Sequence, residues 1–293
     1  MKESAGDKLT IGFMYAFISI FTALCLFPLL ITLGVSLTKE TEVIKYGYSI
    51  IPRAFSLSAY EYIAVALGDK LLRGYGVTLF VTAVGTAASM LVTSMYAYAA
   101  SVKTFKHRNI LAMLAYIPMV FSAGILPWFI VLTRYYHLSN KVYALIVPCL
   151  MNLFYVFLIR NFFSAVPVEL SEAAKIDGAG HARIFTTIVV PVARVGLITV
   201  ALFYALGYWN DFYMALMFIS KQEFYPLQYF LYTMLTNAEF AAMNSQTLGY
   251  RISVPLETIK MALTCVTIGP IVLLFPFIQK YFAKGIVVGG IKG

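Results

Sequence analysis

The chain has 293 residues, of which 61% are hydrophobic and only 12% are charged. Because soluble domains carry about 25% charged residues, this composition excludes a protein surrounded by water. The net charge of +9 would suit a nucleic-acid partner, but the basic residues gather in alternate segments between apolar stretches, which indicates orientation in a membrane.

Six apolar stretches are each long enough to cross a bilayer as a helix, which takes about 20 residues. Helices are the natural choice because they satisfy their own backbone hydrogen bonds in lipid. No linker divides the chain, so we predict an all-α membrane protein with six transmembrane helices in a single transmembrane domain over residues 1–293. The stretches cover about 11–36, 76–101, 110–133, 141–160, 194–219 and 258–282.

The basic residues predict which side of the membrane each segment faces. With the amino terminus inside, the cytoplasmic segments hold twelve of the 22 basic residues but only five of the 13 acidic ones. Such an excess orients helices during insertion, so we expect both termini and the loop at about 161–193 to be cytoplasmic. The first stretch is far longer than the roughly 7–15 apolar residues of a signal peptide, and we expect it to be retained.

The third stretch contains residues that break helices. Pro118, Gly124 and Pro127 lie within it, and each proline removes a helical hydrogen bond. Two interpretations stay open: an ordinary bend, or a break that lines a water-filled cavity, where irregular backbone is tolerated inside a membrane. A similar pair lies in the sixth stretch: Pro270 and Pro276.

The loop at about 161–193 is predicted to form a short helix that ends in a tight turn. Pro167 suits a first helical turn, and Glu169 lies where the helix dipole favours an anion. Gly178 supplies the left-handed conformation that ends a helix. The segment Glu172–Ala179 reads E-A-A-x-x-D-G-A. Three residues follow it at fixed spacing: Phe185, Ile188 and Pro191.

This pattern resembles the coupling loop of ATP-binding-cassette importer permeases, the membrane subunits that a separate ATPase drives. The resemblance implies the ABC type I importer permease fold, with cytoplasmic coupling helices that seat in a cleft of the ATPase. The alternative is an ordinary loop helix with small residues and a glycine cap. The resemblance assigns ATPase coupling to Glu172, Ala173, Ala174, Asp177, Gly178, Ala179, Phe185 and Pro191.

The chain itself lacks a motif for nucleotide binding. No phosphate loop of the form G-x-x-x-x-G-K-[ST] occurs in it, so we expect a non-catalytic subunit with no cofactor or metal of its own. ATP and Mg²⁺ would bind to the partner ATPase. The resemblance implies two ATPase subunits, a second permease chain of related but non-identical sequence, and an external solute-binding protein.

The fifth stretch groups aromatic and polar side chains that suit a sugar, since flat rings cover pyranose faces and polar groups bind hydroxyls. A charge such as that of Asp211 is costly inside a membrane and usually faces a cavity. The alternative is an aromatic belt at the membrane surface. With the broken third stretch, the candidate translocation path comprises Tyr204, Tyr208, Trp209, Asn210, Asp211, Gly124, Pro127 and Trp128.

The end of the chain is similar to the G-G-[VI]-K-G ending of one permease subunit in the carbohydrate-uptake (maltose-type) group of these importers. In that group the tail contacts the ATPases, and the resemblance implies the same contact here. The alternative is an ordinary basic terminus. The tail consists of Gly289, Gly290, Ile291, Lys292 and Gly293.

A further resemblance favours the same group. The segment Phe121–Pro127 is similar to the F-S-G-G-L-I-P run of permeases for complex oligosaccharides such as alginate or pectic fragments, with Ala123 in place of one glycine. We therefore expect import of oligosaccharides by alternating access across a bacterial cytoplasmic (inner) membrane.

The identity of the substrate stays open. Arg134, Lys141 and Arg251 would suit an acidic sugar, whereas neutral oligosaccharides need no cations. A permease for a non-sugar solute is the main alternative. An ion-coupled carrier would need several carboxylates within the membrane, and only Asp211 qualifies. A membrane enzyme would need a catalytic motif, and neither H-E-x-x-H nor G-x-S-x-G occurs.

Overall fold

The structure, a computed structural model, describes residues 5–248 and 256–289, with side chains described over 10–237 and 256–273. Within these ranges the elements are helical, apart from an isolated antiparallel β-bridge between Thr38 and Phe55. The backbone contacts divide the chain into two units. One is Met1–Gly68 with Leu231–Pro270, and the other is Asp69–Phe230 with Ile271–Gly293.

The first unit begins with a long apolar helix, which is followed by a segment of short helices. Lipid is a suitable environment for the first helix, since its apolar side chains are exposed along most of its length. The elements of this unit are α1 (Ala5–Ser36), α2 (Glu40–Tyr46), α3 (Ser58–Tyr62) and η1 (Ile63–Leu67), with parts of α13 (Leu227–Leu248) and α14 (Leu256–Gly289).

Glu40 on α2 caps the start of α14. Its carboxylate accepts hydrogen bonds from the backbone N–H of Glu257 at 3.0 Å and from the backbone N–H and hydroxyl of Thr258 at 2.9 and 2.7 Å. An anion is stabilised there because the first amides of a helix lack partners within it. The Tyr48 hydroxyl donates to Glu257 at 2.7 Å, and this bond, together with burial and the nearby carboxylates, raises the pKa of Tyr48 to about 12. The segment after α1 is thereby fastened to α14.

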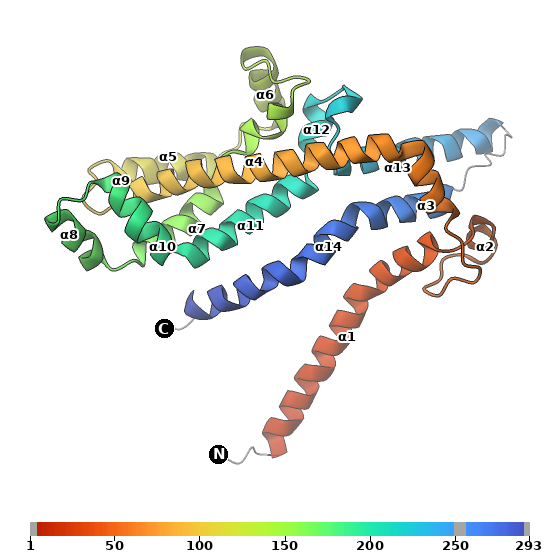
Figure 1. Cartoon of the computed structure of the whole chain (residues 1–293), viewed down its shortest axis with the longest axis horizontal. Helices are drawn as coiled ribbons and strands as arrows, with labels where there is room; N and C mark the ends of the chain where they lie inside the picture. The colour runs from red at the N-terminus through yellow and green to blue at the C-terminus, as the bar shows by residue number, and fades with distance from the viewer. Residues whose placement is uncertain (1–4, 249–255, 290–293) are drawn as a thin grey trace. The chain divides into compact units, whose positions relative to one another are not determined.

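The second unit is built on helices that lie alongside one another, with short helices beyond their ends (Figure 1). The long elements are α4 (Gly68–Ser101), α5 (Arg108–Val120), α7 (Leu153–Ser164) and α11 (Arg194–Asn210). At the Ser101 end of α4 lie α8 (Val168–Ile176), α9 (His181–Ile184), η5 (Phe185–Val189) and α10 (Val190–Val192). The remaining short elements are α6 (Ile125–Ile130), η2 (Val131–Tyr135), η3 (Val142–Leu145), η4 (Val147–Cys149), α12 (Tyr213–Phe218) and η6 (Gln222–Phe224).

Several described helices are long and apolar enough to cross a membrane. Three single helices meet this requirement of length and composition: Thr10–Ser36, Ser58–Ser101 and Leu256–Leu273. Three more candidates are pairs of helices bent at a short break: Arg108–Val120 with Ile125–Tyr135 (115°), Val142–Cys149 with Leu153–Ser164 (53°), and His181–Val192 with Arg194–Asn210 (84°). The predicted helical class is confirmed, and these six candidates overlap the six predicted stretches.

The third stretch is broken and not merely bent. α5 ends at Val120, residues 121–124 are not helical, and Gly124 has a φ of +85°, a conformation that glycine adopts without a steric penalty. The sixth stretch behaves differently, because α14 continues as one helix through Pro270 and Pro276. A proline removes a single hydrogen bond and can bend a helix without ending it.

Small side chains on the buried face of α4 leave room for a tyrosine ring of α11. Gly85, Ser89 and Thr93 recur every four residues and are buried, and residues four apart share one face of a helix. Small residues let the backbones of membrane helices approach one another. At Gly85 an added Cβ atom would come within 2.7 Å of the ring of Tyr208 on α11.

Candidate coupling loop and translocation path

The loop after α7 forms the short helix and the turn that the sequence predicts, with Pro167 just before the first helical turn and not in it. Pro167 stands at the N-cap of α8, with a φ of −55°, and Glu169 lies in the first helical turn. The helix runs to Ile176, so most of the E-A-A-x-x-D-G-A segment is helical. Anions are favourable near a helix N-terminus, and Glu169 meets that requirement.

Gly178 ends α8 in a Schellman motif. Its φ is +83°, its N–H donates to the carbonyl of Lys175 at 3.0 Å, and the N–H of Ala179 donates to the carbonyl of Ala174 at 2.8 Å. This pair of bonds satisfies carbonyls that the end of the helix leaves without partners. A Cβ atom at Gly178 would meet nothing within 4 Å, so glycine is required there for its backbone conformation and not for space.

α8 presents two different faces. Ala174 and Ala179 pack against the hydrophobic core of the second unit, whereas Glu172, Ala173 and Asp177 are exposed. Sequence reasoning missed the most exposed apolar residue of this helix, Ile176, which is 87% exposed. No local pattern distinguishes it from the other apolar side chains of α8, Val168 and Leu170.

The residues that follow the turn connect the loop to the bundle. Phe185 and Ile188 pack against the core. Pro191 lies exposed in α10, next to the 84° bend into α11. The anchoring contacts of the returning segment therefore come from the apolar side chains of η5.

A cleft of about 450 Å³ separates α8 from the ends of α4 and α7. Lys103 and Lys175 line it together with Glu169 and Glu172, so the lysines and the carboxylates balance in formal charge. Phe163 of α7 forms part of its apolar wall. The cleft is thus a space beneath the loop helix without a preference for a charged ligand.

The two tyrosines of the candidate path are buried, and both hydroxyls have partners. The Tyr204 hydroxyl lies 2.7 Å from Thr93 Oγ1 and accepts from the backbone N–H of Asn152 at 2.9 Å. The Tyr208 hydroxyl lies 2.8 Å from Ser89 Oγ and 3.3 Å from the carbonyl oxygen of Ile146. These bonds join α4, α11 and the segment before α7, so both tyrosines position the helices around them.

Trp209 differs from the neighbouring tyrosines. It is only 6% exposed, and its indole N–H has no hydrogen-bond partner among the described residues. An unpaired buried donor costs free energy unless it acquires a partner. Trp209 is therefore a buried donor for which the described residues supply no partner.

Asn210 and Asp211 lie where α11 ends. The Asn210 side chain donates to the Leu206 carbonyl at 2.9 Å and accepts from Gln228 at 3.4 Å. Both carboxylate oxygens of Asp211 lie 3.3 Å from the backbone N–H of Met214 in the first turn of α12. The carboxylate therefore acts as a cap at a helix start.

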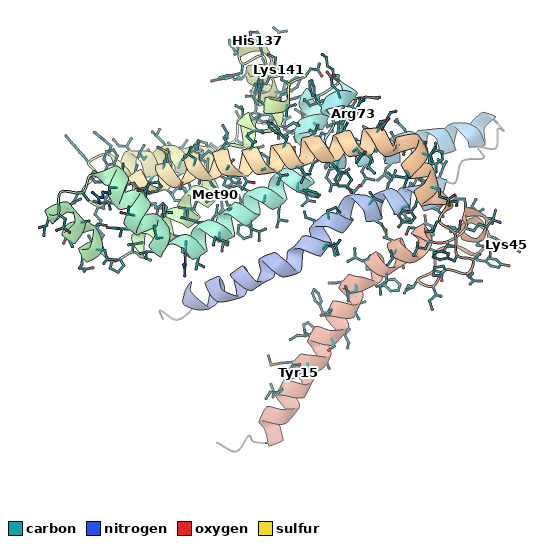
Figure 2. The ribbon with its side chains drawn as sticks, viewed as in Figure 1. Tyr15, Lys45, Arg73, Met90, His137 and Lys141 are labelled. Carbon is teal, nitrogen blue, oxygen red and sulfur yellow. The ribbon has the colours of Figure 1, made fainter. Side chains whose placement is uncertain are left out.

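The third-stretch residues lie beyond the end of α5, where α6 projects to the same side as α12 (Figure 1). Gly124 and Pro127 are exposed. Trp128 packs against Phe218 of α12, with ring centroids 5.5 Å apart. Figure 2 shows His137 and Lys141 in the same projecting region.

Most of the predicted ATPase-contacting tail lies outside the described residues. Gly289 is the last residue of α14. Four tail residues lie beyond the described range: Gly290, Ile291, Lys292 and Gly293. Arg251, one of the three cations considered for an acidic sugar, also lies outside it. The contact between the tail and the ATPases therefore stays a prediction.

Comparison with known proteins identifies the family. Residues 97–288 match the family described as binding-protein-dependent transport system inner membrane component. Protein LplC of Bacillus subtilis (strain 168) is 36% identical over 271 residues, which is 92% of this chain and 90% of LplC. The polygalacturonan/rhamnogalacturonan transport system permease protein YtcP of the same strain is 35% identical over 293 residues, the full length of both chains.

Another relative is the arabinooligosaccharides transport system permease protein AraQ of Halalkalibacterium halodurans. It is 32% identical over 290 residues, which is 97% of this chain and 96% of AraQ. A solved structure, described as a bacterial ABC transporter involved in the import of the acidic polysaccharide alginate, matches with a TM-score of 0.82 and 27% identity. The match covers 96% of this chain and 99% of that one.

These likenesses confirm the type I permease fold and the predicted family resemblance. The chain therefore belongs to the binding-protein-dependent transport system inner membrane component family, as a non-catalytic permease subunit of an ATP-binding-cassette importer.

Proposed function

We propose that this permease imports oligosaccharides. The observation that carries the proposal is the similarity to a polygalacturonan/rhamnogalacturonan permease along the full length of both chains. The relation to an arabinooligosaccharide permease and to an alginate importer supports the same substrate class. Transport would proceed by alternating access, with energy from ATP hydrolysis on a partner ATPase that also carries the Mg²⁺.

The segment Glu172–Ala179 is the proposed docking element for the ATPase. Its exposed face combines carboxylates with the apolar side chain of Ile176, and interfaces gain most of their free energy from a few buried anchors with polar groups around them. Gly178 sets the direction in which the chain leaves α8. We assign the coupling role to this segment together with Phe185 and Pro191.

The proposed translocation path runs past the broken ends of α5 and α11. Tyr204 and Tyr208 form its wall, because their hydroxyls already have partners. Trp209 offers a flat ring and an N–H without a partner among the described residues, a combination that suits a sugar. The path is completed by Asn210, Asp211, Gly124, Pro127 and Trp128.

The proposed topology has six membrane-spanning segments in a single domain, with both termini in the cytoplasm. Each bent helix pair would then count as one span. The membrane is the bacterial cytoplasmic (inner) membrane. The proposed assembly contains two ATPase subunits, a second permease of related but non-identical sequence and an external binding protein. The tail Gly289–Gly293 would contact the ATPases.

Two cations of the projecting region bear on the proposed charge of the sugar. Arg134 and Lys141 are polar groups of the projecting region, and the Lys141 ammonium already lies over the ring of Tyr143 at 5.3 Å. Cations near an entrance raise the local concentration of anionic substrates. We therefore favour an acidic oligosaccharide, derived from pectin or alginate, over a neutral one.

The test is to purify the tagged chain from its native membrane in mild detergent and identify the subunits that co-purify. The complex is then reconstituted in vesicles with its binding protein and offered galacturonan, alginate, arabinan and maltodextrin trisaccharides in parallel. We expect a stoichiometric ATPase, a second permease and ATP-dependent uptake of the acidic sugars.

The possible outcomes separate the candidate functions. Uptake of only the neutral sugars would overturn the acidic substrate but keep the importer. Uptake of a non-sugar solute, with no sugar transported, would overturn the substrate class. Recovery of the chain without any ATPase, in several detergents and lipids, would favour a carrier that works alone.

A further inference from the structure

The last turns of α4 contact the coupling loop through one aromatic side chain. The ring of Tyr98 lies 5.0 Å from that of Phe185 and 6.4 Å from that of His181, centroid to centroid. The Tyr98 hydroxyl is 3.4 Å from His181 Nδ1 and 3.5 Å from the His181 carbonyl oxygen. Aromatic pairs attract one another at these separations, so α4 is attached directly to α9 and η5.

α7 joins the same cluster. Phe163 lies 6.4 Å from Tyr98 and 6.1 Å from Phe185, edge-on in both cases. Phe185 is the phenylalanine of the family motif, and the contact therefore gives that position a partner on α4. We name this group the aromatic junction: Tyr98, Phe163, His181 and Phe185.

The cleft beneath α8 limits the other ways in which the loop can move α4. It separates α8 from the end of α4, with Tyr98 and His181 in its lining. Where α8 and its turn do pack on the core, they do so through the small side chains of Ala174 and Ala179. The aromatic junction is thus a direct route from the segment after α8 to α4, beside the core packing of Ile184 and the hydrogen bond from Arg160 of α7 to the Ala100 carbonyl at 3.1 Å.

α4 continues without interruption from the junction to the proposed path. Thr93 and Ser89 lie five and nine residues before Tyr98, and the longer distance is about 14 Å along a helix. At these two positions α4 is bonded to the hydroxyls of Tyr204 and Tyr208. A continuous helix with fixed contacts at both places transmits a displacement between them.

We propose that Tyr98 is the positioning residue through which the coupling loop moves α4, and that α4 carries this movement to its contacts with Tyr204 and Tyr208. The inference rests on the proposed function, in which Glu172–Ala179 seats in the ATPase. It adds a residue outside the family motif to the coupling machinery.

The test compares Tyr98→Leu with Tyr96→Leu in the full importer, reconstituted with its ATPases and binding protein. Tyr96 is a matched control because it lies two residues away on α4, where its hydroxyl donates to the Leu111 carbonyl of α5 at 2.7 Å. The readouts are ATPase co-purification and ATP hydrolysed per sugar imported, with galacturonan and arabinan trisaccharides supplied together.

We expect Tyr98→Leu to keep the ATPase bound and to raise the ATP consumed per sugar about tenfold, within the range of measured coupling between sites. Tyr98→Phe keeps the ring contacts and should restore most of the coupling. Tyr96→Leu should leave the ratio unchanged. If Tyr98 had only a structural role, Tyr98→Leu would lower the yield of the complex without changing the ATP consumed per sugar.

An unchanged ratio in Tyr98→Leu, or an equal rise in Tyr96→Leu, would overturn the inference. If Tyr98→Leu does not assemble, Phe185→Leu breaks the same contact from the loop side and must raise the ATP hydrolysed per sugar imported. An unchanged ratio in Phe185→Leu would also overturn the inference. Failure of the proposed function is distinguishable, because the wild-type complex would then import no sugar, or Gly178→Pro would import it normally.

Discussion

The ring of Tyr208 lies against the backbone of α4 at Gly85, where a methyl group would come within 2.7 Å of the ring. We expect Gly85→Ala to destabilise the chain by about 1–3 kcal/mol, the usual cost of overpacking. Gly207→Ala is the control, because a Cβ atom at Gly207 meets nothing within 4 Å. The stability of each variant is measured as the temperature at which the detergent-solubilised chain loses its size-exclusion peak. Equal stability of the two variants would show that the helices can separate at little cost.

Gly178 and Gly180 make a second matched pair. Gly178 has a φ of +83°, whereas Gly180 has a φ of −74°, and neither has an atom within 4 Å of an added Cβ. Gly178→Ala should cost about 1–2 kcal/mol of left-handed strain, and Gly178→Pro should also lose the bond to Lys175. We expect both variants to insert normally but to reduce sugar uptake, the proline variant most, and Gly180→Ala to transport normally. Normal sugar uptake by Gly178→Pro would show that Gly178 does not have the coupling role assigned to it.

Ile176 is expected to anchor the ATPase. Truncation of an apolar anchor at the centre of an interface typically costs more than about 1 kcal/mol, so Ile176→Ser should weaken ATPase co-purification about fivefold or more. Ile44→Ser on α2 is the control, because Ile44 is similarly exposed but lies in the first unit. Undiminished recovery of the ATPase with Ile176→Ser would place the interface elsewhere on α8.

Substitutions of Trp209 should affect sugar uptake, whereas substitution of Tyr208 should affect stability. Trp209→Phe removes a buried donor that has no partner among the described residues, so it should leave thermal stability unchanged and slow uptake of the sugar. Tyr208→Phe removes a hydroxyl that contacts Ser89 and Ile146 and should lower stability by about 1 kcal/mol. Trp209→Ala should slow uptake without loosening the ATPase. If it weakens ATPase binding alone, Trp209 belongs to the structure and not to the path.

The cap that Glu40 provides should be measurable. Glu40→Ala leaves the first amides of α14 without their carboxylate partner, and we expect a loss of about 1 kcal/mol, typical of a helix cap. Glu42→Ala removes a carboxylate from the same short helix and serves as the control. The two variants are compared by thermal stability in detergent, and an equal effect of both would argue for a general charge effect.

Local features of this fold could be predicted from the sequence. Gly178 adopts the positive φ that its position at a helix end indicated, because the backbone requirement belongs to the residue itself. Pro270 and Pro276 show the limit of the same reasoning. Proline prevents one hydrogen bond, but whether a helix ends there depends on what surrounds it.

Contacts between distant segments could not be predicted in this way. The sequence indicates Tyr204 and Tyr208 as candidates for a sugar site. It does not show that their hydroxyls form hydrogen bonds with Thr93 and Ser89. The exposure of Ile176 likewise depends on how α8 lies against the core, which no local pattern encodes. These facts follow from packing and required the structure.

The bond between Glu40 and the backbone of Glu257 joins residues 217 positions apart, which has a consequence for synthesis. At about 5–20 residues per second, the ribosome needs about 10–40 s to make the intervening chain. During that interval α2 is already made while its partner does not exist. The first unit is therefore completed only after residues 69–230 of the second have been made, although its first helix is synthesised first. A nascent chain interrupted before α14 would expose a half-built first unit to cellular quality control.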